Sequence, residues 1–207
     1  MNKKERALLI EKILDQEIPH PKIPLYSTNT YTLLLAILLS AHSTDKTVNR
    51  ITPSLFEKAD SAQKMLRLSI EEIKAIIRPC GLSQRKATFI YQLSEILVKK
   101  YKGIVPKTLK KLEELPGVGH KTASVLLVTA FHEPAFPVDT HIHRCAKRWR
   151  LSKGKNRQQT ERDLKKLFPK EKWGKIHLQM ILYARKFCPA LRHRIEHCPL
   201  CHQLRDR

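Results

Sequence analysis

Residues Leu109–Phe131 read LKKLEELPGVGHKTASVLLVTAF and contain the pattern that decides the fold. The amphipathic first part predicts a short helix, and the apolar run that begins near His120 predicts a longer one. Pro116-Gly117-Val118-Gly119 predicts the tight turn between them, because glycine adopts backbone conformations that are closed to other residues. The two glycines also leave bare N–H groups at a helix start, where a phosphate oxygen can bind. The stretch therefore predicts a helical hairpin with a phosphate-binding turn. An ordinary hairpin with a glycine turn is the alternative.

The chain carries far more positive than negative charge. Its 207 residues include 40 Lys and Arg against 19 Asp and Glu, which gives a formal net charge of +21. Residues 144–207 are the most basic part, with 19 Lys or Arg against 5 Asp or Glu. A surplus of this size indicates a polyanionic partner, with nucleic acid as the first candidate and a merely basic soluble protein as the alternative. Apolar residues make up 42%, so the chain is not disordered and can bury a sizeable core.

Helical periodicity runs through almost every segment, and no alternating strand pattern interrupts it. Ser69 and Glu72 form the pattern of a capping box, and prolines such as Pro53 are expected between helices. We expect an all-α fold with two helical lobes and a cleft for nucleic acid between them. Residues 22–132 would form the central lobe with the hairpin, and residues 1–21 plus 133–207 the second lobe.

The N-terminal stretch MNKKERALLIEKIL is charged and helical, without the apolar centre of a signal peptide. The longest strongly apolar run, Leu33–Leu39, is too short to cross a bilayer. We therefore expect a cytoplasmic protein with no membrane partner. Cysteines in that compartment are usually reduced, so clustered cysteines there indicate metal or redox chemistry rather than disulfides.

Two residues carry the candidate chemistry. Lys121 directly follows the predicted turn, where it can contact a phosphate or, as a neutral amine, attack a sugar carbon. The stretch Pro137–Trp149 reads PVDTHIHRCAKRW, and Asp139 or Thr140 can cap the helix that follows. A capping aspartate alone is a structural feature. Its occurrence eighteen residues after the lysine is what favours a functional pairing.

These stretches together resemble the endonuclease III family of helix-hairpin-helix glycosylases. LPGVGHKTA followed by FPVDTHIHR is similar to the family's central motif. Upstream, LLAILLSAHSTD at Leu34–Asp45 is similar to its LL-A-LLSAQ-TD segment, and CGLSQRKA at Cys80–Ala87 to its GL-x-x-x-KA segment. Gly103–Pro106 resembles the family's G-x-VP segment before the hairpin. The resemblance covers essentially the whole chain, in order.

The resemblance implies a mechanism. A damaged pyrimidine leaves the duplex and enters a pocket between the lobes. Lys121 attacks the sugar C1′, displaces the base and forms an imine, and β-elimination then breaks the strand on the 3′ side. Asp139 helps to deprotonate the lysine and stabilises positive charge on the sugar. The partner is then double-stranded DNA with a damaged base or an abasic site, and we expect a monomer.

Two further residues match DNA-contacting positions of the family. His42 stands where the family usually has a glutamine that fills the hole left by the flipped base, so the choice of opposite base is open. Leu82 matches a loop that wedges into the duplex, where an apolar side chain offsets part of the unstacking cost. For both residues a plain loop or core contact is the alternative.

The cysteines near the C-terminus depart from the family pattern. Cys188, Cys198 and Cys201 form C-x9-C-x2-C, whereas the family carries C-x6-C-x2-C-x5-C and binds a [4Fe-4S] cluster through four thiolates. The position six residues after Cys201 holds Arg207, so the fourth cysteine is missing. Three alternatives stay open: a [4Fe-4S] cluster with an unusual fourth ligand such as His193, His197 or His202, a zinc ion on three cysteines and one histidine, or no metal. Cys80 and Cys145 are expected to be buried small hydrophobes.

The function indicated by these motifs is a bifunctional glycosylase and abasic-site lyase for oxidised pyrimidines. The related adenine glycosylases normally lack the lysine after the hairpin and add a C-terminal recognition domain, which does not match Lys121 and the end at residue 207. A silent DNA-binding module is the other alternative. It is disfavoured because binding alone needs neither Lys121 nor Asp139.

Overall fold

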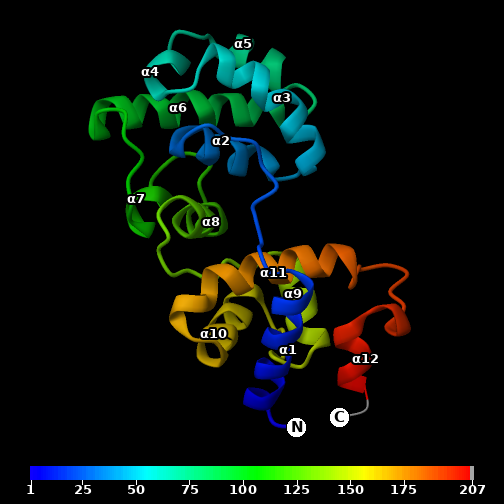
Figure 1. Cartoon of the computed structure of the whole chain (residues 1–207). Coiled ribbons are helices and arrows are strands. Elements are labelled where there is room, and N and C mark those ends of the chain that lie inside the picture. The colour runs from blue at the N-terminus through cyan, green and yellow to red at the C-terminus, as the bar shows by residue number, and fades with distance from the viewer. Residues whose placement is uncertain (206–207) are drawn as a thin grey trace. The chain divides into compact units, whose positions relative to one another are not determined.

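The computed structural model describes residues 1–205, and all regular structure in that range is helical (Figure 1). The chain divides into two compact units. One comprises Met1–Ile23 and His132–Arg207, here called the terminal unit, and the other is Pro24–Phe131, here called the central unit. No helix among the described residues is both long enough and apolar enough to cross a membrane.

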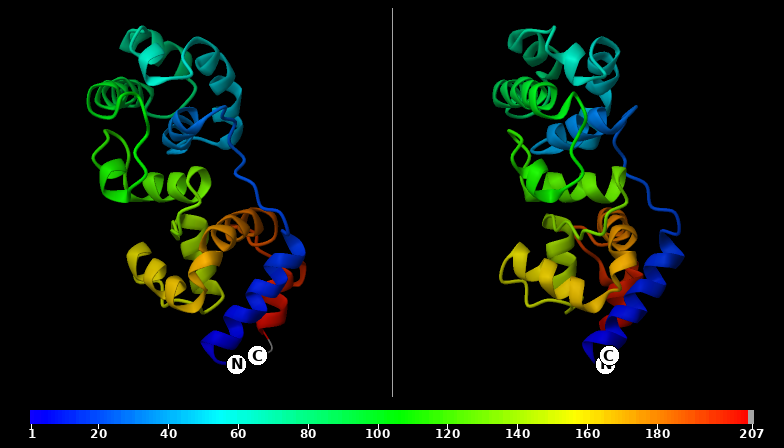
Figure 2. Two further views of the ribbon diagram at one scale, coloured as in Figure 1. Left: turned by 60° about the vertical axis from the view of Figure 1, so that its left-hand side comes forward. Right: turned by 90° about the vertical axis from the view of Figure 1, so that its left-hand side faces the viewer.

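The central unit is built around helix α2, Thr30–Ser40, which is buried on nearly every side. It contacts α3, α6 and α8 (Figures 1 and 2). Its apolar run therefore forms the centre of a small helical domain. The hydroxyl groups of Tyr31 and Ser94 lie 2.6 Å apart inside this core. The other helices of the unit are α3 Asp45–Lys58, α4 Ala62–Met65, α5 Ile70–Ile77, α6 Ser83–Tyr101, α7 Leu109–Glu113 and α8 His120–Ala130.

The terminal unit packs around α11, Trp173–Lys186, which contacts α1 and α9. Trp149 and Tyr183 are fully buried, with their rings edge-to-face at 5.7 Å. Such aromatic pairs stabilise a core beyond the area that they bury. The other helices of the unit are α1 Lys3–Glu17, α9 Thr140–Arg148, α10 Arg157–Leu167 and α12 Pro199–Arg205, with 3-10 turns η1 Lys170–Lys172 and η2 Ile195–His197.

Local signals set several helix ends. The capping box predicted at Ser69 and Glu72 is confirmed, with both reciprocal hydrogen bonds present at the start of α5. The expectation that Pro53 separates helices is wrong, because it lies inside α3. A proline in a helix interior removes one backbone hydrogen bond, at a cost of about 3 kcal/mol. The buried apolar face of α3, which includes Val48 and Leu55, offsets that cost through core packing.

Candidate functional site

The hairpin predicted at residues 109–131 consists of α7, a turn, and α8. Leu115 and Val118 anchor the turn in the core of the central unit, and the Val118 N–H donates to the Leu115 carbonyl at 3.0 Å. His120 Nδ1 lies 2.8 Å from a carboxylate oxygen of Glu113, which ties the start of α8 to the end of α7. The turn is therefore held from both sides.

The two glycines of the turn have different roles. Gly117 has φ +77°, and a Cβ placed there would lie 2.6 Å from Phe89 Cδ2. Only glycine fits this position without strain. Gly119 has φ −85° and ψ 175°, and a Cβ placed there would meet nothing within 4 Å. The expectation that both glycines need conformations closed to other residues therefore holds for Gly117 and is wrong for Gly119.

Gly119 is the N-cap of α8, and no side chain caps the helix at this end. Lys121 is exposed in its first turn. Uncapped N–H groups at a helix N-terminus carry partial positive charge and suit a phosphate oxygen. The absent side chain at Gly119 keeps the approach to these groups open. Close approach, rather than backbone freedom, is what this glycine provides.

His42 and Leu82 lie on neighbouring loops of the central unit, and both have left-handed backbones, with φ 55° and 61°. Both side chains are exposed, Leu82 by 58%. An exposed leucine in an unfavourable conformation costs free energy with no gain in packing. They line one cavity of about 160 Å³ together with Gly117. The complete lining is Leu38, Ala41, His42, Leu82, Arg85, Lys86, Phe89 and Gly117. The structure thus brings three of the predicted DNA-contacting residues together.

Lys86 holds these two loops in place. Its side chain is only 4% exposed, and Nζ donates to the Leu39 carbonyl at 2.8 Å, to the Ala41 carbonyl and to Ser43 Oγ at 3.1 Å. Three acceptors match the three protons of an ammonium group. Burial lowers the pKa of Lys86. Ser43 Oγ also accepts from the Gly81 N–H at 3.1 Å, so one buried cation connects the His42 loop to the Leu82 loop.

Asp139 occupies the N-cap of α9 and is 8% exposed. Its Oδ1 accepts a hydrogen bond from the Ile142 N–H at 2.8 Å. No residue in the described range 1–205 donates to Oδ2. The cap confirms one of the two predicted capping residues and fixes the carboxylate. One oxygen therefore starts the helix, and the cap does not use the other.

The three cysteines predicted to bind metal lie together in the terminal unit. Cys188, Cys198 and Cys201 form a group with His193 in which all ligand atoms lie within 4.8 Å of one another. The Sγ atoms of Cys188 and Cys201 are 3.8 Å apart. Three thiols and an imidazole are a donor set that iron–sulfur clusters and zinc both accept. The group could therefore hold a metal, in agreement with the cofactor expected from the sequence.

Helix α9 carries the groups that support this cysteine cluster. Arg148 Nη1 donates to Cys188 Sγ and to the Pro189 carbonyl, each at 3.1 Å, and Arg144 Nη2 donates to the Cys188 carbonyl at 2.9 Å. Cys145 is fully buried, as predicted, and it lies beside Cys188. The thiols of Cys145, Cys198 and Cys201 beside Cys188, together with the Arg148 guanidinium, lower the pKa of the Cys188 thiol.

Sequence reasoning missed the roles of Lys86, Ser43 and Arg148. Lys86 lies within the CGLSQRKA stretch, but nothing in the sequence separates a buried lysine from the many exposed ones. Arg148 stands four residues after Arg144 on α9, so both can reach the same partner segment. That spacing was the one signal available.

The two glycines allow a matched test of the hairpin. We expect Gly117→Ala to lower the free energy of unfolding by about 1–2 kcal/mol, because it forces an L side chain into a left-handed backbone. Gly119→Ala should cost less stability than Gly117→Ala, because alanine is only a poorer N-cap there and its backbone is not strained, and it should weaken DNA binding, because its methyl group obstructs the open N-terminus of α8. Urea unfolding and a DNA-binding titration measure both. Equal stability losses in the two variants would contradict these roles.

The Lys86→Met variant tests whether the positions of the His42 and Leu82 loops matter for binding damaged DNA but not for binding undamaged DNA. The variant leaves the Leu39 and Ala41 carbonyls without their partner, which costs about 1–3 kcal/mol of stability. We expect binding to a duplex with an abasic-site analogue to fall about tenfold, the equivalent of about 1.4 kcal/mol. Binding to undamaged duplex should hardly change. The exposed Lys64→Met provides the control, and an equal loss on both duplexes would count against the assigned role.

Comparisons with known proteins agree with this site. Residues 35–170 match the model of the HhH-GPD superfamily of base excision DNA repair proteins. The chain is 37% identical to endonuclease III of Bacillus subtilis over 207 residues, covering 100% of this chain and 94% of that protein. It is 39% identical to endonuclease III of Escherichia coli K12 over 198 residues, covering 96% and 93%. A solved structure of a trapped covalent intermediate between an endonuclease III and DNA matches with a TM-score of 0.93 and 36% identity, covering 100% of both chains. The chain belongs to the endonuclease III family, within the HhH-GPD superfamily.

Proposed function

We propose that this chain is a base-excision-repair DNA glycosylase with abasic-site lyase activity, acting on oxidised pyrimidines. The observation that carries the proposal is the position of Lys121, in the first turn of the helix that follows the hairpin turn. The whole chain is similar to endonuclease III of Bacillus subtilis. A relative trapped as a covalent intermediate with DNA supports the same type of chemistry.

The proposed reaction starts with the neutral amine of Lys121. Its nitrogen bonds to C1′ of the damaged nucleotide, the C1′–N bond breaks, and the base leaves with the bonding electrons and a proton. The sugar ring then opens, and the lysine nitrogen and C1′ form an imine. The imine acidifies the proton on C2′. Loss of that proton expels the 3′ phosphate oxygen, and water finally hydrolyses the imine and frees Lys121.

Asp139 is the proposed carboxylate partner of Lys121. We propose that it accepts the amine proton and stabilises positive charge on the sugar. Its burial and its hydrogen bond to Ile142 support this role, because a fixed carboxylate in a water-poor environment stabilises developing charge most effectively. Catalysis needs a fixed oxygen, and the N-cap geometry supplies one.

Double-stranded DNA is the proposed partner, bound by one copy of the chain in the cytoplasm. The open N-terminus at Gly119 and the turn at Gly117 would hold the phosphate backbone. His42 would fill the space left by the flipped base, and Leu82 would enter the base stack beside it. The strained, exposed conformations of these two residues support contact with a ligand rather than with the protein core.

A metal group bound by Cys188, Cys198 and Cys201 would have a structural role in this proposal. It would cross-link the residues of the C-terminal segment. Helix α9 holds this segment through Arg144 and Arg148, and α11 holds it through Tyr183, whose hydroxyl accepts from the Leu200 N–H at 2.9 Å. Nothing in the sugar chemistry requires it.

Lys121→Gln is the direct test of the proposed nucleophile. The variant keeps a long polar side chain at an exposed site, so we expect unchanged stability and DNA binding within about threefold, or about 0.7 kcal/mol. Strand cleavage at an abasic site should vanish. Gel analysis of a labelled duplex measures this, with the exposed Lys110→Gln as control. Cleavage by Lys121→Gln at the rate of the unaltered chain would disprove the assignment.

Asp139→Asn should separate capping from catalysis. Asparagine caps helices as well as aspartate does, so the hydrogen bond to Ile142 and the thermal stability should both persist. Without the carboxylate charge, we expect the rate of base release to fall by about 10²–10⁴-fold, the usual range for a lost general base. Single-turnover kinetics on a duplex with one thymine glycol measures this. A loss of stability with little change in rate would instead indicate a purely structural residue.

A further inference from the structure

We propose that His193 is the fourth ligand of a metal centre that also contains Cys188, Cys198 and Cys201. The family pattern uses four cysteines, and this chain lacks the fourth. In the structure an imidazole occupies the remaining place: one ring nitrogen of His193 lies within 4.8 Å of all three sulfur atoms. The resulting donor set is three thiolates and one imidazole.

The His193 ring also has an unexplained polar atom. Its Nε2 is buried and has no hydrogen-bond partner among the described residues. Buried polar atoms in native proteins are nearly always paired, and an orphan atom calls for a partner such as an ion. A metal ion bonded to Nε2 would satisfy it. The proximity of three thiols and the unpaired nitrogen are separate observations that point to the same ligand.

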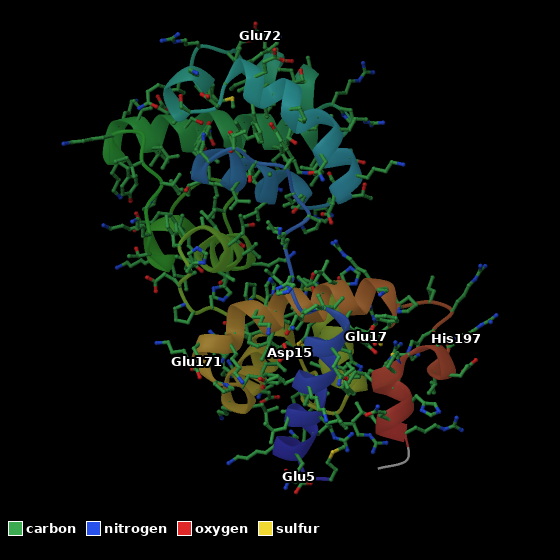
Figure 3. All side chains as sticks on the ribbon, viewed as in Figure 1. Glu5, Asp15, Glu17, Glu72, Glu171 and His197 are labelled. Carbon is green, nitrogen blue, oxygen red and sulfur yellow. The ribbon has the colours of Figure 1, made fainter. Side chains whose placement is uncertain are left out.

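The other candidates in this segment do not meet the same conditions. His197, on the 3-10 helix η2, is exposed (Figure 3). His202 on α12 is exposed as well. Neither belongs to the group of mutually close donors. Cys145 lies beside Cys188, but it is outside that group as well. Within residues 1–205, His193 is therefore the donor that completes the set.

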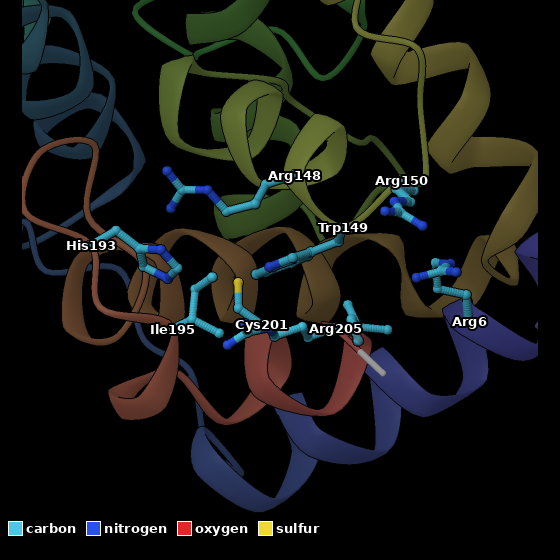
Figure 4. Close-up of a pocket in the computed structure, with 9 residues that line it drawn as sticks. Arg6, Arg148, Trp149, Arg150, His193, Ile195, Cys201 and Arg205 are labelled. Carbon is cyan, nitrogen blue, oxygen red and sulfur yellow. The ribbon is translucent and has the colours of Figure 1, made fainter. Parts of the chain in front are cut away.

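The surroundings suit a negatively charged centre. His193, Cys201 and Arg148 line one cavity of about 210 Å³ in the terminal unit, and Figure 4 shows the imidazole, the sulfur and the guanidinium around the same space. Arg148 also donates to Cys188 Sγ at 3.1 Å. A neutral imidazole in place of a fourth thiolate makes the centre less negative by one charge, which lowers the cost of burial.

The donor set fits two kinds of metal centre. The family implies a [4Fe-4S] cluster, and thiolates with one imidazole also bind zinc. Two thiolates bonded tetrahedrally to one zinc ion at about 2.3 Å lie about 3.8 Å apart. Cys188 and Cys201 have that separation, 3.8 Å. These separations match a single ion, because the four ligands of a [4Fe-4S] cluster bind four different iron atoms and lie further apart. His193 is the proposed fourth ligand of either centre, and metal analysis distinguishes them.

The test compares the whole chain, purified without added metal, with three variants. These are His193→Ala, His193→Cys and the control His197→Ala, which removes an exposed histidine from the same segment. Iron, zinc and acid-labile sulfide are measured per chain, before and during exposure to a chelator. X-ray absorption at the edge of the metal that is present then counts its sulfur and nitrogen neighbours.

We expect one centre per chain in the unaltered protein, with nitrogen as well as sulfur bonded to the metal. Iron with sulfide would identify a cluster, and zinc without sulfide a single ion. His193→Ala should lose metal at least about tenfold faster, as expected when a metal site is weakened. His193→Cys should retain the metal with sulfur neighbours only, and His197→Ala should match the unaltered chain. If the metal is an iron–sulfur cluster, His193→Cys should also lower its reduction potential.

Three results would overturn the assignment. They are a metal-free protein, a centre with sulfur neighbours only in the unaltered chain, and equal metal retention in His193→Ala and His197→Ala. Retention by His193→Cys guards against the possibility that His193→Ala merely misfolds. These measurements use no DNA, so they stand independently of the chemistry proposed for Lys121.

Discussion

The hydrogen bonds from α9 to the Cys188 segment are the interactions on which the functional part of the terminal unit depends. Arg144, in the middle of α9, donates to the Cys188 carbonyl, and Arg148, its last residue, donates to the Cys188 sulfur and the Pro189 carbonyl. Asp139 is the N-cap residue of the same helix. Helix α9 therefore bears the proposed catalytic carboxylate at its N-cap, and its arginines bind the segment that carries the proposed metal ligands.

The central unit relies on a comparable constraint. Lys86 is a buried cation that binds carbonyls at and beyond the C-terminus of α2, where the helix dipole is negative. Its contacts hold the loops that bear His42 and Leu82 in left-handed conformations. Burial of an ammonium group and two strained backbone conformations cost free energy, and they leave two exposed residues in fixed positions. Such a pattern is typical of a binding site, where order is needed before the ligand arrives.

Much of this organisation could be predicted from the sequence because it depends on local signals. The hairpin follows from the glycine turn between two apolar periodic segments, and the start of α5 follows from Ser69 and Glu72. The clustering of the three cysteines follows from their spacing, and none of these cysteines forms a disulfide in the described residues. Each of these signals lies within a few residues of the structure that it specifies.

The remaining features depend on contacts between distant segments. Pro53 is tolerated inside α3 because of core packing, which its neighbours in sequence do not reveal. In the sequence, nothing distinguishes Lys86 from the exposed basic residues, because its burial results from the packing of α2 against α6. The sequence does not distinguish His193 from His197 and His202 as a ligand. The path of the loop determines that His193 is the one close to the sulfur atoms. Likewise, the open space around Gly119 is a property of the folded surface and not of the turn motif.

The central claim is that Lys121 forms an imine with the sugar of a damaged nucleotide. Borohydride reduces such an imine to a stable amine and so links protein to DNA irreversibly. We would trap the unaltered chain on a duplex with one thymine glycol, digest the adduct and locate the modified residue by mass spectrometry. The account predicts a covalent adduct whose sugar remnant is on Lys121. An adduct on another residue, or tight binding without any adduct, would contradict it.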